Sequence, residues 1–136
     1  MKKNVIERIL QKTIRDLDHE KKSLATKEEE LTKLQLDLQK SLDCIEKEKK
    51  LVIDYPHLHG FGEFFELEQK KQTIIKNNIN QATEEMSLIR DQLRNILAEQ
   101  KKYEYILKKI ELKELKKQEK IERDILDSFN NRAEMI

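Results

Sequence analysis

A leucine, isoleucine or valine occupies every seventh position from residue 10 to residue 52, and this repeat constrains the fold more than any other feature of the sequence. Its members are Leu10, Leu17, Leu24, Leu31, Leu38, Ile45 and Val52. A seven-residue apolar repeat places its side chains along one stripe of an α-helix, which a second helix covers in a left-handed coiled coil. The repeat therefore predicts a long helix with a partner helix.

The positions four residues after the members of this repeat are of mixed polarity. They are Ile14, Lys21, Glu28, Gln35, Leu42 and Lys49. We expect these companion positions to complete the contact surface of the helix. The expected partners of Lys21, Glu28 and Gln35 are Ile96, Ile89 and Ala82. Polar residues at such positions fix the register of a coiled coil at a cost in stability, and they would also leave part of the partner's apolar stripe open to a third surface.

The composition favours long helices over a compact domain. Of the 136 residues, 40% are charged and 37% are hydrophobic, against roughly 25% and 45–50% in ordinary globular domains. A chain this polar cannot close a sizeable core, so we do not expect an enzyme, nor any catalytic, cofactor or metal site. The 28 Lys and Arg residues nearly balance the 27 Asp and Glu residues. This balance removes a global electrostatic reason to bind nucleic acid or an anionic membrane.

The single proline and both glycines of the chain lie between residues 54 and 62. Pro56 lacks a backbone donor and disrupts a helix interior, and Gly60 and Gly62 permit the dihedral angles of a turn. The sequence therefore predicts a helix over 3–54, a turn over 55–62 and a helix over 63–133. The second helix has its own apolar stripe, with spacings of four and three residues: Ile75, Ile79, Ala82, Met86, Ile89, Leu93, Ile96, Gln100, Tyr103, Leu107 and Ile110.

A chain that folds back at residues 58 and 59 brings the two stripes together. In this register the numbers of paired residues sum to 117, with Leu10 on Leu107, Leu24 on Leu93, Leu31 on Met86, Leu38 on Ile79, Leu42 on Ile75 and Val52 on Phe65. The same register pairs Ile45 with Gln72 and places Lys49 beside Glu68. We therefore predict an all-α fold, a single two-helix antiparallel coiled-coil hairpin over residues 1–136. The turn disfavours the alternative, a parallel dimer of straight helices.

In this register the second helix extends beyond the start of the first. The partner of Lys3 is near Glu114, so residues 115–136 form a C-terminal helix overhang of about 33 Å. Apolar residues continue along it: Leu115, Ile121, Ile125, Leu126 and Phe129. An uncovered apolar face is typical of a helix that binds in the groove of a partner. The alternative is a frayed end or local self-association.

Other residues with chemical potential lie in contexts that argue against a site. His57 and His59 are two residues apart in a turn and do not form a complete ligand set for a metal. Cys44 is the single cysteine; it cannot form an intrachain disulfide, which is compatible with a reducing compartment. The N-terminus lacks the apolar stretch of a signal peptide, and no segment approaches the roughly 18 apolar residues of a membrane span. We expect a cytosolic protein with no direct membrane insertion.

Residues 101–120 contain eight lysines and four glutamates. The glutamates alternate with the lysines at helical spacing, which predicts a solvated face with ion pairs between residues i and i+4. Docking on an acidic protein surface is the second interpretation. Nucleic-acid binding is the third, because Lys dominates over Arg and Tyr103 lies on the apolar stripe. We therefore expect no nucleic-acid partner.

Three features together resemble the FliJ family, the small coiled-coil stalk proteins of the bacterial flagellar export apparatus, and their counterparts in related secretion systems. One is the plan of a two-helix hairpin with a longer second helix. Another is the turn entry Leu51-Val52-Ile53-Asp54-Tyr55 followed by Glu63-Phe64-Phe65. The third is the C-terminal run 118–132, which is similar to a family tail that ends in Leu-Asp-Glu-apolar-Ala-x-x-Arg. Leu126, Asp127, Phe129 and Arg132 fit that tail, and Ser128 and Asn130 depart from it.

The resemblance implies a non-enzymatic stalk. The paired helix ends would lie in the central hole of the hexameric export ATPase, the face near the turn would contact the cytoplasmic domain of the export gate membrane protein, and the tail would handle export chaperones. The protein would be cytoplasmic and peripherally associated with the inner membrane through the apparatus. The implied gate-contacting residues are Val52, Tyr55 and Phe65, and the implied partner-binding residues of the C-terminal end are Leu115, Ile121, Ile125, Phe129 and Arg132.

Two other interpretations remain open. One is a generic coiled-coil scaffold or tethering protein that binds another helical partner, and the other is a nucleic-acid-binding arm built on residues 101–120. A neighbouring ATPase or flagellar gene would favour the stalk, and a pull-down of unrelated helical proteins would favour the scaffold. Salt-sensitive retention on heparin or DNA would favour the arm.

Overall fold

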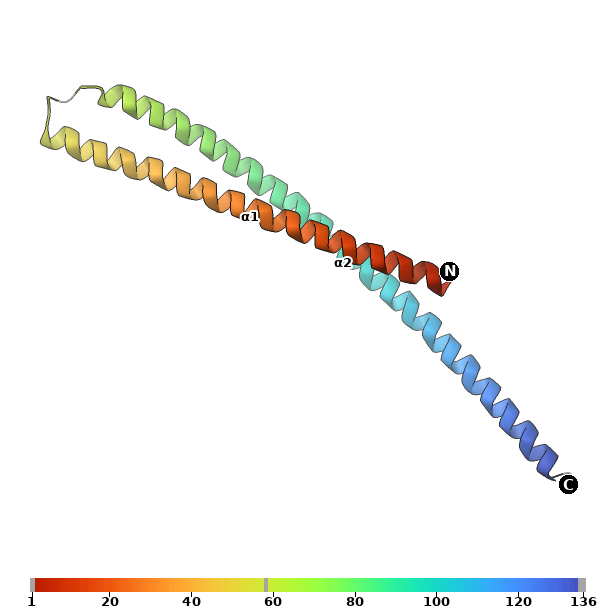
Figure 1. Cartoon of the computed structure of the whole chain (residues 1–136). Helices are drawn as coiled ribbons and strands as arrows, with labels where there is room; N and C mark the ends of the chain where they lie inside the picture. Colours follow the sequence, from red (N-terminus) through yellow and green to blue (C-terminus); the bar gives the residue numbers. More distant parts are fainter. Residues whose placement is uncertain (1, 58, 135–136) are drawn as a thin grey trace. The chain divides into compact units, whose positions relative to one another are not determined.

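The chain folds into two long helices. The computed structural model describes residues 2–57 and 59–134, with side chains described as far as residue 133. Helix α1 spans Lys3–Asp54 and helix α2 spans Phe61–Glu134 (Figure 1). These described residues contain no strand, which confirms the predicted all-helical class. Neither helix is apolar enough over a sufficient length to cross a membrane, within the residues the structure describes.

The helix boundaries follow from Pro56 and Gly60. The predicted end of α1 at residue 54 is confirmed, because a residue that precedes a proline is disfavoured in helical geometry and Tyr55 is that residue. Gly60 has a positive φ of 94°, and its carbonyl accepts the Phe64 N–H at 3.0 Å. The helix therefore starts directly after Gly60, at Phe61 and not at residue 63. Gly62 lies inside the first turn of α2, although the predicted position of this glycine is in the loop.

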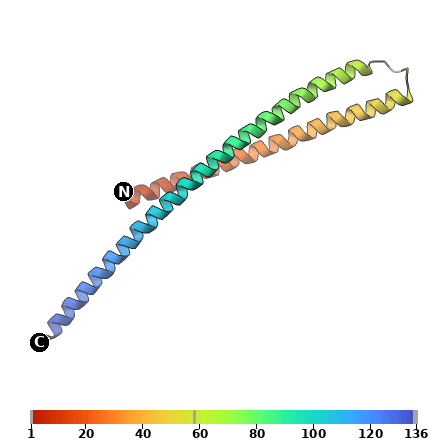
Figure 2. The ribbon, with the colours of Figure 1, turned by 180° about the vertical axis from the view of Figure 1, so that it is seen from behind.

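Contacts between residues divide the chain into two compact units. One unit consists of Met1–Asp18 with Arg94–Ile136, and the other is His19–Leu93. In the unit His19–Leu93, the α1 and α2 segments lie side by side (Figures 1 and 2) and bury Ile45, Ala82 and Met86. In the unit formed by the two chain ends, the buried apolar residues are Ile6 and Leu17, and Lys3 forms an ion pair with Glu114 at 3.5 Å.

The seven-residue repeat of α1 is the contact stripe, as predicted. Leu17 and Ile45 are buried, and the remaining members are half-buried. The predicted companion row is wrong, because Ile14, Leu42 and the four polar members of that row are all exposed. The companions lie three residues after the repeat and not four; they are Thr13, Glu20, Lys27, Leu34, Ser41 and Glu48, each buried or half-buried.

The apolar stripe of α2 is confirmed at every predicted position. All members from Ile75 to Ile110 are buried or half-buried, including the polar Gln100. The stripe also continues toward the start of the helix through Gln72, Glu68, Phe65 and Phe61, which are likewise buried or half-buried. The Phe61 and Phe65 rings stack one helical turn apart, with centroids at 5.9 Å.

The pairing across the unit His19–Leu93 differs from the predicted one by about one helical turn. The expected partner of Gln72 was Ile45, whereas the Gln72 amide donates a hydrogen bond to Ser41, four residues earlier in α1. The expected ion pair between Lys49 and Glu68 is absent in the described structure. Lys49 pairs with Glu46 at 3.8 Å, and Glu68 accepts hydrogen bonds from Ser41 and Lys71. A shift of one turn keeps the same stripe of each helix in contact, so sequence spacing alone does not exclude it.

Candidate functional surfaces

In the described residues, the side chains that could ligate a metal ion do not gather in one place. Among them, no three His, Cys, Asp or Glu side chains lie together in a group able to hold a metal ion. His57, His59 and Cys44 are all exposed. The surface hollows are shallow and open to solvent. A two-helix contact leaves little room between its elements, and the functional candidates are therefore exposed faces and polar contacts between the helices.

A buried polar cluster joins α1 to α2 at Ser41. The Ser41 hydroxyl donates to Glu68 Oε2 at 2.6 Å and accepts from Gln72 Nε2 at 3.2 Å. Lys71 Nζ donates to the other Glu68 oxygen at 3.3 Å. The hydrogen bond from Ser41 holds the pKa of the Glu68 carboxyl below its ordinary value of 4.5, although desolvation acts in the opposite direction. The cluster keeps a carboxylate ionised inside a helix contact, where an unpaired charge would be costly.

A second polar contact between the helices centres on Lys27. Its ammonium group forms ion pairs with Glu85 of α2 and, at 3.2 Å, with Glu30 of α1. The hydrogen bond to Glu85 raises the pKa of Lys27, and the same bond lowers the pKa of Glu85. Gln81 also donates to Glu85, at 3.2 Å. Lys27 was not among the predicted contact residues, because the wrong companion row excluded it.

The C-terminal part of α2 is uncovered. Every described side chain from residue 111 to residue 133 is exposed, including Leu115, Leu126 and Phe129. Four of the predicted partner-binding residues line one shallow hollow together with Asp124 and Ser128; they are Ile121, Ile125, Phe129 and Arg132. Leu115 is exposed but does not line this hollow. The structure therefore brings most of the predicted C-terminal set onto one surface.

The predicted residues near the turn fall into two groups. Tyr55 is 62% exposed, and Ile53, two residues earlier in the chain, is also exposed. Val52 and Phe65 are half-buried, and Phe65 stacks on Phe61. Of the three predicted gate-contacting residues, Tyr55 is therefore the exposed one. The pairing of Ser41 with Gln72 is about one helical turn away from the register that would place Val52 on Phe65.

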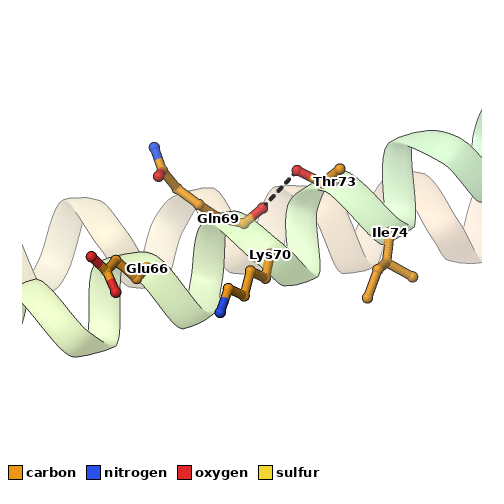
Figure 3. A pocket seen from close by; sticks show the side chains of 5 residues that line it. All are labelled: Glu66, Gln69, Lys70, Thr73 and Ile74. Atoms are coloured by element: carbon orange, nitrogen blue, oxygen red, sulfur yellow. Dashed lines mark hydrogen bonds between the residues drawn. The ribbon is translucent and has the colours of Figure 1, made fainter.

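An exposed apolar row on α2 was missed by the sequence analysis. Leu67, Ile74 and Leu88 occupy one phase of the heptad, outside the contact stripe, and all three are exposed. Ile74 borders a shallow hollow with Glu66, Gln69, Lys70 and Thr73, which are drawn in Figure 3. The Thr73 hydroxyl donates to the Gln69 carbonyl of the same helix at 3.0 Å. The signal that could have revealed the row is the shared heptad phase of its members, with Leu67 and Ile74 seven residues apart and Leu88 fourteen residues further on.

The lysines of residues 101–120 are solvated but do not form the predicted i,i+4 ion pairs. In the part of the chain that the structure describes, the only ion pair of this segment joins Glu114 to Lys3. Two lysines contact aromatic rings instead. Lys109 Nζ lies 4.7 Å from the centre of the Tyr105 ring, and Lys102 Nζ lies 5.5 Å from that of Tyr103.

Comparisons of the chain with protein-family models, with curated proteins and with solved structures give no match. The resemblance of the turn entry and the tail to the FliJ family therefore stays a prediction.

Proposed function

We propose that the protein is a non-enzymatic stalk of a flagellar type III protein export apparatus, of the kind that the FliJ family represents. In this proposal it docks in the ring of the hexameric export ATPase, contacts the cytoplasmic domain of the export gate and handles export chaperones. It works in the cytoplasm and reaches the inner membrane through the apparatus. The two long helices are compatible with such a role.

The proposal includes an antiparallel coiled-coil hairpin. Its support is the order of the contacts in the unit His19–Leu93. Lys27 precedes Ser41 in α1, whereas its partner Glu85 follows Glu68 and Gln72 in α2. A register with Ser41 opposite Gln72 also places the newly found companion row of α1 against the stripe of α2. Polar residues within such a contact specify register in coiled coils.

The observation that supports the function most strongly is the hollow on the uncovered end of α2. Ile121, Ile125 and Phe129 are spaced by four residues, lie on one helix face and border the hollow with Arg132. A helix with apolar anchors at this spacing binds in an apolar groove of a partner. Phe129 and Arg132 are also two of the residues that fit the family tail, so the exposed surface and the resemblance indicate the same segment.

Association with the hexameric export ATPase of the same organism tests this proposal. Phe129→Asp removes an apolar anchor that is 69% exposed. We expect at least a tenfold loss of affinity for the ATPase, with unchanged helicity by circular dichroism. Leu88→Asp is the matched control, since Leu88 is 63% exposed but lies on another part of α2. Wild-type affinity in Phe129→Asp, or an equal loss in Leu88→Asp, would contradict the proposed surface.

The exposed row of Leu67, Ile74 and Leu88 favours a second candidate, a generic coiled-coil scaffold or tethering protein. Leu67 and Ile74 are seven residues apart, and Leu88 follows after two heptads, with Gln81 between them. Apolar side chains in one heptad phase form a stripe to which another helix can bind, and the stalk proposal assigns no partner to this stripe. If Leu88→Asp abolishes a helical partner's binding while Phe129→Asp has no effect on any association, the scaffold explains the molecule better than the stalk.

A further inference from the structure

One face of α2 combines exposed lysines with an exposed tyrosine and leucine. Its six residues fall within an arc of about 100° on a helix with 3.6 residues per turn. All six side chains are exposed, with Tyr105 at 60% and Leu112 at 52%. We call this the Tyr105–Leu112 face, and its members are Lys101, Tyr105, Lys108, Lys109, Leu112 and Lys116.

The negative charges of the segment lie elsewhere on the helix. Glu104, Glu111 and Glu114 fall outside the arc, and the first carboxylate on the face itself is Glu119, beyond its C-terminal end. Within the described residues, none of the four lysines of the face forms an ion pair with a carboxylate. The net charge of the whole chain, +1, therefore conceals a one-sided concentration of positive charge.

The apolar members of the face lie among its lysines. Lys109 covers the Tyr105 ring at 4.7 Å, and Leu112 lines a shallow hollow with Ile106, Lys109 and Lys116. The aliphatic stems of lysines next to apolar side chains allow the ammonium groups to extend toward a charged surface while the stems and the apolar groups stay in contact. An interfacial amphipathic helix uses the same combination of cations and apolar side chains on a membrane.

We propose that the Tyr105–Leu112 face binds the surface of an anionic lipid membrane directly. Tyr105 and Leu112 lie at the headgroup level, and the four lysines neutralise lipid phosphates. A nucleic acid offers similar phosphates, but the exposed aliphatic side chain of Leu112 gains nothing from a hydrated phosphate backbone, whereas it is buried at the boundary between headgroups and acyl chains. The helix lies on the membrane and does not cross it. This goes beyond the proposed function, in which a membrane protein mediates the association.

Co-sedimentation of the full-length chain with lipid vesicles tests the proposal. One set of vesicles contains equal amounts of phosphatidylglycerol and phosphatidylcholine, and the other contains phosphatidylcholine alone. We expect binding to the anionic vesicles that weakens as salt concentration rises, because exposed charges are screened, and at least a tenfold weaker interaction with the neutral vesicles. Equal binding to both kinds of vesicle, or binding to neither, would overturn the proposal.

Paired variants locate the contact. Lys109→Gln with Lys116→Gln should lower the affinity for anionic vesicles about 25-fold, at about fivefold per lysine, which corresponds to about 1 kcal/mol each. Lys33→Gln with Lys47→Gln is the control, because it removes the same charge from exposed positions of α1. Leu112→Ser should weaken binding at constant charge, and Leu88→Ser is its control. Equal losses in a variant and its control would show that the face is not the contact surface.

Two further measurements separate this proposal from the alternatives. A duplex DNA bound more tightly than the anionic vesicles, with loss in Lys109→Gln/Lys116→Gln and none in Leu112→Ser, would replace the membrane with a nucleic acid and overturn the proposal. Phe129→Asp should bind anionic vesicles like the wild type. The membrane proposal and the ATPase proposal can therefore be contradicted independently of each other.

Discussion

Polar side chains are buried in one part of this protein, while large apolar side chains are exposed in another. Glu68, in the unit His19–Leu93, is 8% exposed, whereas Phe129, at the C-terminal end of α2, is 69% exposed. The two residues belong to the same helix. The difference shows that burial follows the presence of a facing helix and not the hydrophobicity of the residue. In a chain whose core is only a stripe, a residue is buried because of where its partner lies.

The polar side chains of the cluster can be buried in the helix contact because they form hydrogen bonds with one another. In the described residues, no buried side-chain nitrogen or oxygen lacks a hydrogen-bond partner. Ser41 both donates and accepts, so Glu68 and Gln72 share one hydroxyl between them. A fully satisfied polar network within a helix contact favours one arrangement of the helices over others, since any displacement leaves a buried group unpaired.

The largest effect is expected from a charge placed in the covered stripe. Met86 is buried, and Met86→Asp would introduce a carboxylate with no arranged partner. We expect a loss of about 3 kcal/mol in the free energy of unfolding, measured by urea titration with circular dichroism. Leu88→Asp, two residues away and exposed, should change this quantity by no more than about 0.5 kcal/mol. Equal effects at the two positions would contradict the assigned stripe.

Removal of the central hydroxyl of the polar cluster should have an intermediate effect. Ser41→Ala deletes the donor to Glu68 and the acceptor for Gln72, and a typical intramolecular hydrogen bond contributes about 1 kcal/mol. The urea midpoint should therefore fall by less than in Met86→Asp. Ser87→Ala, at an exposed position, is the control and should leave the midpoint unchanged. If both serine variants behave like the wild type, the cluster does not stabilise the helix contact.

Acid should weaken the unit His19–Leu93 through Glu68 and Glu85. The pKa of each carboxyl is lowered in the folded protein from its ordinary value of 4.5. Their stabilising contribution is therefore fully present above pH 4.5 and is lost as the pH falls through the folded pKa. Thermal melts should show a falling Tm below pH 4.5, with a smaller fall in Glu68→Gln. An identical pH dependence in the variant would show that Glu68 does not contribute.

The smallest change in stability is expected at the uncovered end of α2. Phe129→Asp alters a side chain that touches no facing helix in the described structure, so the free energy of unfolding should stay within about 0.5 kcal/mol of the wild type. The same urea titration as for Met86→Asp measures this difference. A large loss would mean that the apolar face is covered in solution, for example by a second copy of the chain.

Local features of the sequence were sufficient to predict that there are two helices and where α1 ends, but α2 starts two residues earlier than predicted. Pro56 determines where α1 ends, and the spacing from Ile75 to Ile110 identifies the covered stripe of α2 without error. The run of apolar residues in the tail likewise predicted the surface that contains Ile121, Ile125 and Phe129. The end of α1 and the apolar stripe of α2 depend on backbone chemistry and on residues within a few turns, and both can be evaluated from the sequence.

The covered companion row of α1 and the pairing of α1 with α2 were decided only by the tertiary structure. A row of leucines at seven-residue spacing has a neighbouring row three residues later and another four residues later, and in α1 both rows are of mixed polarity. Thr13 and Ser41 are covered while Ile14 and Leu42 are exposed, because the covered row is the one on the side where α2 lies. The pairing of Ser41 with Gln72 has the same origin. Registers one helical turn apart bring the same stripes together, so the choice between them depends on contacts between residues far apart in the chain.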